Sequence, residues 1–259
     1  MKKRRAFKIF YSVVWALFLR EVQVLYGSKK LGYLWAVVDP MIMIIVFSIV
    51  HSSLMKGASL GYDYPVFLAT GFLAYNLFRS IVFKSMEAFN ANRGLFVYKQ
   101  VKPIDTIVAR VLVEVFQISI VAMIFVFIGW YFEFDLRVEN FNMVVLAVAW
   151  FVLFGFGLGV LFGVVGTFYE NFKKIVTIAF MPLFFLSALF YTVESLPQQA
   201  REVILFNPVV HFIELIHGSY FYALDTAYVS FEYMLYWTLV PLFLGLYFYR
   251  KSERKILSI

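Results

Sequence analysis

Residues 143–168 read MVVLAVAWFVLFGFGLGVLFGVVGTF and contain no charged side chain. A run of about 20 apolar residues is long enough to cross the roughly 30 Å hydrocarbon core of a bilayer as a helix. Further apolar runs of this kind cover residues 31–54, 65–83, 104–132, 175–193 and 231–250. The sequence therefore predicts an all-α integral membrane protein with six transmembrane helices in one membrane domain over residues 1–259.

The composition excludes a soluble globular protein. Of the 259 residues, 63% are hydrophobic, 21% are aromatic and only 15% are charged, whereas soluble domains carry about a quarter charged residues. The net charge of +7 is also found in nucleic-acid-binding proteins. Here, however, the basic residues gather beside the apolar runs, where anionic lipid head groups attract them. We therefore expect a membrane protein with no nucleic-acid partner.

The basic residues also predict an orientation. All of the 23 Lys and Arg residues except Lys56, Arg137 and Arg201 fall in the two tails, or in or next to the loops that share a side with them. Cytoplasmic segments of membrane proteins are enriched in Lys and Arg. Both termini are therefore expected in the cytoplasm.

Two segments differ from simple spans. In residues 5–28, polar side chains recur every three or four positions among aromatic ones, which is typical of an amphipathic helix lying in the membrane interface. A seventh, poorly formed span is the alternative. Residues 197–224 contain an apolar stretch that is too short to cross and is broken by polar residues. This pattern predicts re-entrant helices between spans five and six, with a surface helix on the outer face as the alternative.

A stripe of glycines marks the fourth span. Gly155, Gly159 and Gly163 each lie four positions after the last and share one helix face. Small residues at this spacing let another helix backbone approach closely. The stripe predicts close helix packing inside the chain, and a subunit interface is the alternative.

No catalytic or metal site is indicated. The chain has no Gly-rich loop followed by Lys and Ser or Thr that would hold phosphates, so we expect it to bind neither ATP nor another cofactor itself. His211 and His217 are six positions apart, which does not place both on one helical face as metal ligands. Cysteine is absent, which removes disulfides and thiolate chemistry.

Charged residues in or beside spans are candidate functional residues, since even lenient scales assign them about +2.5 to +3.5 kcal/mol at a helix centre. Asp39 is expected at a kink near the cytoplasmic entrance or on a substrate path. Arg110 and Glu114, four residues apart, are expected to pair on one helix face. Arg79 and Lys84 lie close enough to a span end to extend toward the interface.

Aromatic residues are dense, with 32 Phe, 17 Tyr and 5 Trp. Interfacial belts and packing against lipid explain most of them. Some lie where the two mouths of a conduit would be, and aromatic faces bind the apolar C–H faces of sugars. The composition therefore permits a path for a glycan. The aromatic candidates for this path are Tyr33, Trp35, Tyr62, Tyr64 and Tyr75.

Two groups of residues resemble motifs of a known family. The first group is Arg20, Glu21, Tyr26, Ser28, Leu31, Gly32, Trp35 and Pro40. The second group is Leu196, Pro197, Arg201, Asn207, Pro208 and Glu214. They resemble the N-terminal signature and the segment after the fifth span of type-2 ABC exporters, specifically the permeases of capsular polysaccharide export (KpsM type). The resemblance covers essentially the whole chain.

The resemblance implies a permease subunit of the bacterial inner membrane that is not itself an enzyme. It implies a homodimer with two copies of a separate ATP-binding cassette subunit, which would bind ATP and Mg²⁺. The implied substrate is a lipid-linked polysaccharide, and periplasmic and outer-membrane export proteins are further implied partners. Exporters of another glycan, such as O-antigen or teichoic acid, or of a small drug or lipid, are the alternative. A lone membrane enzyme acting on lipids is the competing class. It would need a cluster of acid, base or metal ligands at one interface, and the sequence shows none.

The resemblance also implies roles for particular residues. Those implied to couple the chain to the ATPase are Glu87, Asn92, Arg93 and Gly94. Those implied for the re-entrant segment near the outer mouth are Pro197, Arg201, Asn207, Pro208 and Glu214. His217 stands near where many relatives carry Arg, so an anion contact there would depend on pH.

Overall fold

The computed structural model describes residues 6–27, 32–54, 61–169 and 171–258, and every regular element in these ranges is a helix. In chain order the elements are α1 (Ala6–Gly27), α2 (Gly32–Leu54), α3 (Tyr64–Ala91), η1 (Arg93–Leu95), α4 (Pro103–Tyr131), α5 (Phe141–Phe168), α6 (Phe172–Phe185), η2 (Val193–Ser195), α7 (Gln198–Ile204), α8 (Pro208–Tyr220) and α9 (Phe231–Leu257). The predicted all-α class is confirmed.

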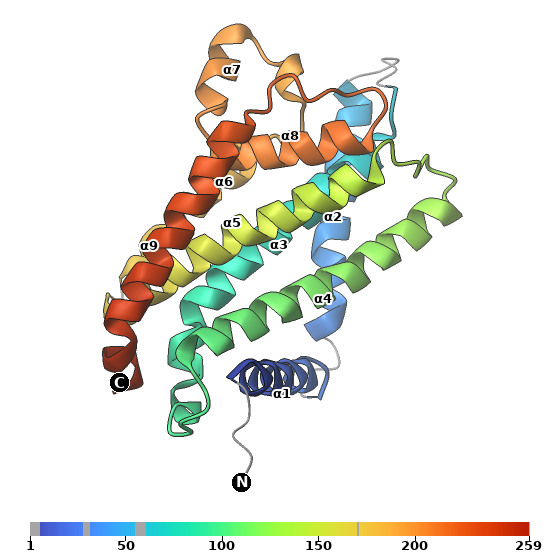
Figure 1. The fold of residues 1–259 in the computed structure, drawn as a ribbon. Helices are drawn as coiled ribbons and strands as arrows, with labels where there is room; N and C mark the ends of the chain where they lie inside the picture. Colours follow the sequence, from blue (N-terminus) through green and yellow to red (C-terminus); the bar gives the residue numbers. More distant parts are fainter. Residues whose placement is uncertain (1–5, 28–31, 55–60, 170, 259) are drawn as a thin grey trace.

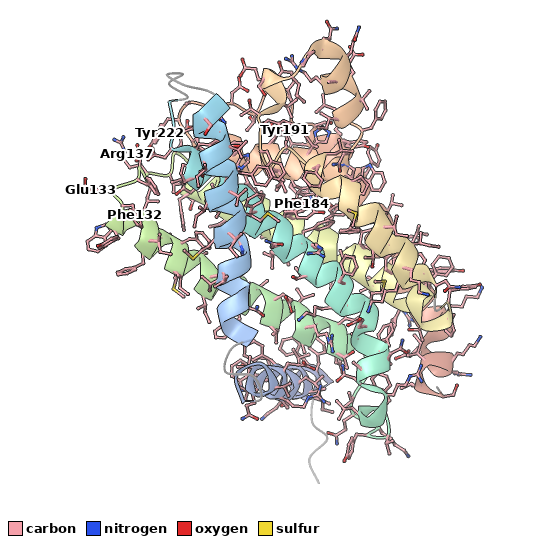
Figure 2. The ribbon with its side chains drawn as sticks, turned by 180° about the vertical axis from the view of Figure 1, so that it is seen from behind. Phe132, Glu133, Arg137, Phe184, Tyr191 and Tyr222 are labelled. Atoms are coloured by element: carbon pink, nitrogen blue, oxygen red, sulfur yellow. The ribbon has the colours of Figure 1, made fainter. Side chains whose placement is uncertain are left out.

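The long helices form an inclined bundle with two distinct ends (Figure 1). One end carries α1 and the last turns of α9, and the other end carries α7 and α8. Seen from behind, α2 lies across α3 and α4 (Figure 2). The chain therefore places its two unusual segments, the N-terminal helix and the α7–α8 pair, at opposite ends of the bundle.

Within the described ranges, α3, α4, α5 and α9 are long and apolar enough to cross a membrane. The pair α7 and α8, which meet at 108°, would add a fifth span if it crossed as one unit. The described part of α2 contributes a shorter apolar stretch, Pro40–His51. Four or five spans are thus supported by length and composition, and the six predicted spans stay a prediction.

The fifth predicted span, 175–193, is helical over only part of its length. Helix α6 ends at Phe185, three residues after Pro182. Ala188 then adopts a φ of 56°, a left-handed value that does not continue a helix. Ser187 to Leu189 are fully buried. The apolar character of this stretch therefore serves a buried turn, and the expectation of a continuous helix over 175–193 is wrong.

Helix α1 runs across the bundle and is seen nearly end-on in Figure 1. Val14 and Leu17 of α1 are buried against Ala109 of α4. The exposed aromatic side chains of α1 include Phe7, Tyr11 and Trp15. Because α1 does not run alongside the long helices, its direction favours the interface helix predicted for residues 5–28 over a seventh span.

Aromatic side chains fill the centre of the bundle around α3. The rings of Phe78 and Phe151 stack with 4.6 Å between their centroids, and those of Phe154 and Phe212 with 5.2 Å. These rings join α3, α5 and α8, and all four are at most 2% exposed. Offset or stacked aromatic pairs of this kind contribute about 0.5–1.5 kcal/mol beyond their buried area. The core therefore holds α8 inside the bundle.

The glycines of α5 allow close contact with two neighbours. A Cβ atom on Gly159 would lie 2.7 Å from the Cβ of Ser85 in α3, and one on Gly163 would lie 3.1 Å from the Ser85 carbonyl oxygen. On another side of α5, a Cβ on Gly157 would lie 2.9 Å from the backbone nitrogen of Leu242 in α9. The glycine stripe therefore packs inside the chain, as predicted, with no subunit interface needed to explain it.

Gly157→Ala is expected to lower the thermal stability of the detergent-solubilised protein, although Ala is the better helix former. The added methyl group would press on backbone atoms of Leu242, which have no rotamer to change, at a cost of about 1–3 kcal/mol. Intrinsic tryptophan fluorescence during heating measures the loss. Gly94→Ala is the control, because a Cβ there meets nothing within 4 Å. Equal midpoints for the two variants would contradict the close α5–α9 contact.

Candidate functional site

The end of α3 and the turn after it carry the residues predicted to couple the chain to an ATPase. Asn92 is buried, and its amide donates to the Ala88 carbonyl at 2.9 Å. The side-chain oxygen of Asn92 accepts a hydrogen bond of 2.5 Å from the Arg20 guanidinium of α1. Arg93 and Gly94 follow in η1 and are exposed. Asn92 thus anchors the turn, whereas Arg93 and Gly94 are accessible to a partner.

Two further polar contacts lie at this end of the bundle. Glu87 of α3 forms an ion pair with Lys173 of α6. Arg20 also lies 2.8 Å from Glu21 within α1. Exposed ion pairs contribute only about 0–1 kcal/mol. Of the two contacts, only the pair of Glu87 and Lys173 joins different helices, α3 and α6.

The loop after η1 exposes two large apolar side chains that sequence reasoning missed. Val97 is 82% exposed and Tyr98 is 65% exposed, directly before the cationic Lys99. Both side chains lie in a short polar loop between two predicted spans. Large apolar residues in such a loop were the sequence signal for an exposed apolar surface. Together with Arg93 they are exposed side chains of the loop between α3 and α4.

At the opposite end, Arg201 of α7 connects three segments. Its guanidinium donates to the carbonyl oxygens of Glu194 at 2.8 Å and Leu196 at 3.1 Å. It also donates to the Tyr228 hydroxyl at 2.6 Å and lies 4.6 Å over that ring. A guanidinium with several fixed donors is suited to this kind of bridging. Arg201 therefore closes the turn before α7 onto the loop before α9.

Asn207 and Glu214 hold α8 against the turn that follows α6. The side-chain oxygen of Asn207 accepts from the Val209 N–H at 3.0 Å and caps α8, while its amide donates to the Leu186 carbonyl at 2.9 Å. Glu214 accepts from the Val193 N–H at 2.6 Å. The two side chains satisfy backbone groups that no helix satisfies.

Two prolines mark the starts of the helices in this segment. Pro197 is the N-cap residue of α7, and Pro208 occupies the first turn of α8. A proline costs little in the first turn of a helix, where the missing N–H would have no intrahelical partner. Both prolines therefore set helix boundaries.

Helix α8 is almost completely buried. Ten of its residues, among them Phe212 and Leu215, are classed as buried, and the helix packs against α3, α5 and α9. A surface helix would keep one face in water or in the interface. The surface-helix alternative for residues 197–224 is therefore disfavoured for α8, which lies among the long helices.

The two histidines of α8 have different surroundings. His211 accepts from the Ser230 N–H through Nδ1 at 3.2 Å, so Nε2 carries the proton and donates to the Leu205 carbonyl at 2.9 Å. His217 is fully buried, with its ring centroid 4.0 Å from that of Phe67 and no hydrogen-bond partner among the described residues. This enclosure leaves His217 out of reach of an external anion in the described structure.

Tyr62 and Tyr64 lie half-buried at the first turn of α3. The Tyr62 ring lies 5.2 Å from the rings of Phe67 and Phe221. Burial raises the pKa of Tyr62 to about 12, so its hydroxyl stays protonated at neutral pH. The Tyr64 hydroxyl donates to the Phe190 carbonyl at 2.8 Å. Both tyrosines therefore belong to an aromatic cluster at this end.

The remaining path candidates are not brought to this cluster by the described structure. Tyr75 is fully buried in the core, where its hydroxyl donates to the Phe180 carbonyl of α6 at 3.2 Å. The side chains of Tyr33, Trp35 and Asp39 lie outside the described part of the structure. Their place on a substrate path stays a prediction.

The pair expected between Arg110 and Glu114 is not formed. Glu114 instead lies 3.4 Å from the ammonium group of Lys84, which reaches it from α3. Arg110 donates to the Lys84 carbonyl at 3.1 Å. The contact between two helices has replaced the contact within one helix.

Tyr228 and Ser230 were missed by sequence reasoning. They bond to Arg201 and His211, which lie 27 and 19 residues earlier. No spacing rule connects residues at such separations, so only the fold identifies these partners.

Comparison with known proteins places the chain in a family. The family model described as ABC-2 type transporter matches residues 12–221. The chain is 34% identical to the polysialic acid transport protein KpsM of Escherichia coli, over 98% of this chain and 99% of that protein. It is 30% identical to the capsule polysaccharide export inner-membrane protein CtrC of Neisseria meningitidis serogroup A, over 90% and 88%. It is 25% identical to the O-antigen export system permease protein RfbA of Klebsiella pneumoniae, over 75% and 74%.

The matched region contains α2, α3, α4 and α5 together with the α7–α8 segment that Arg201, Asn207 and Glu214 hold in place. Both groups of residues that carried the resemblance in the sequence lie within it. The chain belongs to the ABC-2 type transporter family.

Proposed function

We propose that this chain is the membrane-spanning permease subunit of an ABC exporter that moves a lipid-linked capsular polysaccharide from the cytoplasm across the bacterial inner membrane. The observation that carries this proposal is the similarity over 98% of the chain to a protein named for polysialic acid transport. Two capsule export proteins and an O-antigen permease among its relatives support the same class of substrate.

ATP hydrolysis is assigned to a separate subunit in this proposal. The sequence has no Gly-rich loop with Lys and Ser or Thr to hold phosphates. Membership of the ABC-2 family supports an ATP-binding cassette partner, which would hold ATP and Mg²⁺. We propose two copies of that partner on a homodimer of this chain, with periplasmic and outer-membrane export proteins as further partners.

The proposed topology has six spans, formed by α2 to α6 and α9, with α7 and α8 as the re-entrant segment. In Figure 1, α1 and the last turns of α9 lie at the same end of the bundle. This placement supports the same side of the membrane for both ends of the described chain. The Lys and Arg distribution supports the cytoplasm as that side. The α7–α8 end would then face the periplasm.

The proposed ATPase contact lies on α1 and the first inner loop. Arg93 and Gly94 are exposed and would touch the partner directly. Asn92 and Glu87 would act as positioning residues, since they bond to α1 and α6. Displacement of η1 by the ATPase would then move α1 and the start of α6 as well.

The proposed substrate path leads from α2 toward the outer aromatic cluster. Its candidates on α2 are Tyr33, Trp35 and Asp39, and those at the outer end are Tyr62 and Tyr64. Tyr75 is enclosed in the single chain, so its proposed contribution is to hold α6 beside α3. The outer mouth of the path would be formed by α7, α8 and the turns before them, which contain Pro197, Arg201, Asn207, Pro208 and Glu214.

A second candidate function is export of another glycan by the same architecture. The similarity to an O-antigen permease over three quarters of the chain favours this alternative over export of a drug or a free lipid. The two glycan proposals share the fold, the ATPase partner and the direction of transport, and they differ in the polymer alone.

Deletion of the gene is expected to abolish surface polysaccharide while polymer accumulates in the cytoplasm, because synthesis continues without export. Immunodetection of polymer on intact and on lysed cells measures both pools, and the wild-type gene in trans is the control. Unchanged surface glycan in the deletion strain would contradict glycan export and favour a small-molecule or lipid substrate.

Arg93→Glu is expected to weaken copurification of the ATPase subunit or to uncouple its hydrolysis from export, because it reverses a charge on the proposed contact. ATPase activity of the purified complex and surface polysaccharide are the measurements. Lys251→Glu, an equally exposed charge reversal near the end of α9, serves as the control. Normal copurification and normal export with Arg93→Glu would refute the docking proposal.

Single cysteines test the orientation cleanly, because the natural chain has none. In cells with a permeable outer membrane, Glu139→Cys between α4 and α5 is expected to react with an impermeant maleimide. Lys251→Cys is expected to react only after the inner membrane is opened. The reverse pattern would place the termini in the periplasm.

A further inference from the structure

Two hollows follow one another along α2, α3 and α4. The larger is a cleft of about 530 Å³ lined by residues including Met41, Ile45, Val66, Leu73, Ala122 and Phe132. The smaller is a cavity of about 210 Å³ lined by residues including Pro40, Asn76, Arg79, Ser80, Glu114 and Gln117. On each helix the lining residues of one hollow come directly or almost directly after those of the other. The three helices therefore form one groove with two parts.

The larger part of the groove is apolar. Among its polar lining residues, Thr70 donates its hydroxyl to the Phe67 carbonyl at 2.9 Å, and Tyr220 lies 3.4 Å from the Leu136 carbonyl. These two groups are used inside the protein, and Ser48 is a further polar lining residue, whose buried hydroxyl has no hydrogen-bond partner in the described structure. One free hydroxyl in an otherwise apolar cleft is little to bind a sugar. Clefts of about 300–1,000 Å³ hold small organic ligands. The cleft suits an aliphatic chain.

The smaller part of the groove is polar. Asn76 and Ser80 lie four positions apart on α3, and Glu114 and Gln117 lie three apart on α4, so each pair shares one helix face. The side-chain oxygen of Gln117 is buried without a hydrogen-bond partner in the described structure. Buried polar atoms normally have a partner. An acceptor with no protein partner indicates that a group with an O–H or N–H donor binds in the cavity.

The charged residues that line the cavity are Arg79 and Glu114. The side chain of Asp39, which precedes the lining residue Pro40, lies outside the described residues. Glu114 is compensated by Lys84 at 3.4 Å. Arg79 is exposed and lies 5.6 Å from the Phe83 ring, with no Asp or Glu within 4 Å among the described residues. A guanidinium presents a planar set of donors that matches phosphate oxygens. Arg79 therefore offers an anion, such as a phosphate, a guanidinium that no described carboxylate neutralises.

The order of the two parts matches a lipid in the leaflet nearer α1. The polar cavity lies toward the α1 end of α2, α3 and α4. The cleft lies toward the other end of these helices, and one of its lining residues, Phe132, is labelled in Figure 2. A phospholipid in that leaflet has its phosphate toward α1 and its acyl chains toward the membrane centre. The polar cavity therefore lies on the side of the lipid's phosphate, and the apolar cleft lies on the side of its acyl chains.

We propose that this groove binds an anionic phospholipid of the inner leaflet, with its phosphate on Arg79 and an acyl chain in the cleft lined by Ala122. The groove adjoins the substrate path proposed above, because its lining residues Pro40 and Pro65 directly follow Asp39 and Tyr64. It lies apart from the proposed ATPase contact at Arg93 and Gly94. The lipid would cover α3 between α2 and α4 and fill the groove that the protein leaves open. Exchange of this lipid would proceed sideways, into the membrane.

The test uses the full chain purified with its copurifying ATPase subunit in mild detergent. Native mass spectrometry measures binding of phosphatidylglycerol and of phosphatidylcholine with the same acyl chains. The natural chain is expected to prefer phosphatidylglycerol. Arg79→Gln is expected to weaken phosphatidylglycerol binding about tenfold, in line with loss of a charge-assisted hydrogen bond, and to remove the preference. Lys251→Gln, which removes an exposed cation outside the groove and outside the proposed ATPase contact, is the matched control and should keep it.

Ala122→Phe tests the apolar part, because the larger side chain would occupy the cleft. It is expected to weaken binding of both lipids equally while the head-group preference persists. Arg79→Lys keeps the charge but loses the planar donors, and it should bind phosphatidylglycerol between the natural chain and Arg79→Gln. This variant keeps the test decisive should the glutamine variant fail to fold.

Two outcomes would overturn the proposal. An unchanged preference for phosphatidylglycerol in both Arg79 variants would show that Arg79 does not bind the head group. Lipid that copurifies only from cells making the exported polymer would identify the occupant as the lipid anchor of the polymer. Lipid retained from polymer-deficient cells supports the proposed membrane phospholipid.

Discussion

The close backbone contacts of α5 are the constraint on which the rest of the arrangement depends. In a bilayer, lipid tails are as apolar as the helices, so helices associate through close packing and hydrogen bonds. Gly159 brings α5 against Ser85 of α3, and Gly157 faces Gly245 of α9, whose own Cβ would lie 3.0 Å from the Gly157 carbonyl oxygen. Because α3 and α9 also pack against α8, these contacts fix the pocket that encloses α8.

Irregular backbone inside such a bundle needs partners, since the hydrocarbon region offers no water. The segment between α6 and α8 meets this need with side chains. Asn207 satisfies the Leu186 carbonyl, Glu214 satisfies the Val193 N–H, and Arg201 satisfies two further carbonyl groups. The residues that identified the family in the sequence are thus, in this segment, the residues that make a non-helical turn stable. In the described structure, the polar groups of these side chains bind backbone atoms of the protein itself.

Apolar length, glycine spacing and helix periodicity predicted the long helices, α1 within one residue of its expected ends, and the intramolecular role of the glycine stripe. These patterns gave wrong predictions where contacts between distant parts of the chain determine the local structure or the ion-pair partner. Residues 186–193 are as apolar as a span, and only the buried turn at Ala188 separates them from α6. Glu114 pairs with Lys84 from another helix, which a rule for one helix cannot anticipate. Among the coupling candidates, sequence could not distinguish buried Asn92 from exposed Arg93.

Helix α3 is the element through which the two ends of the molecule would communicate. At one end, Asn92 bonds to α1 and Glu87 pairs with α6. In the middle, the Tyr75 hydroxyl bonds to the Phe180 carbonyl, again on α6. At the other end, Phe67 packs against His217 of α8. A rigid helix with contacts along its whole length moves as one body, so a displacement imposed at η1 would reach α6 and α8 together.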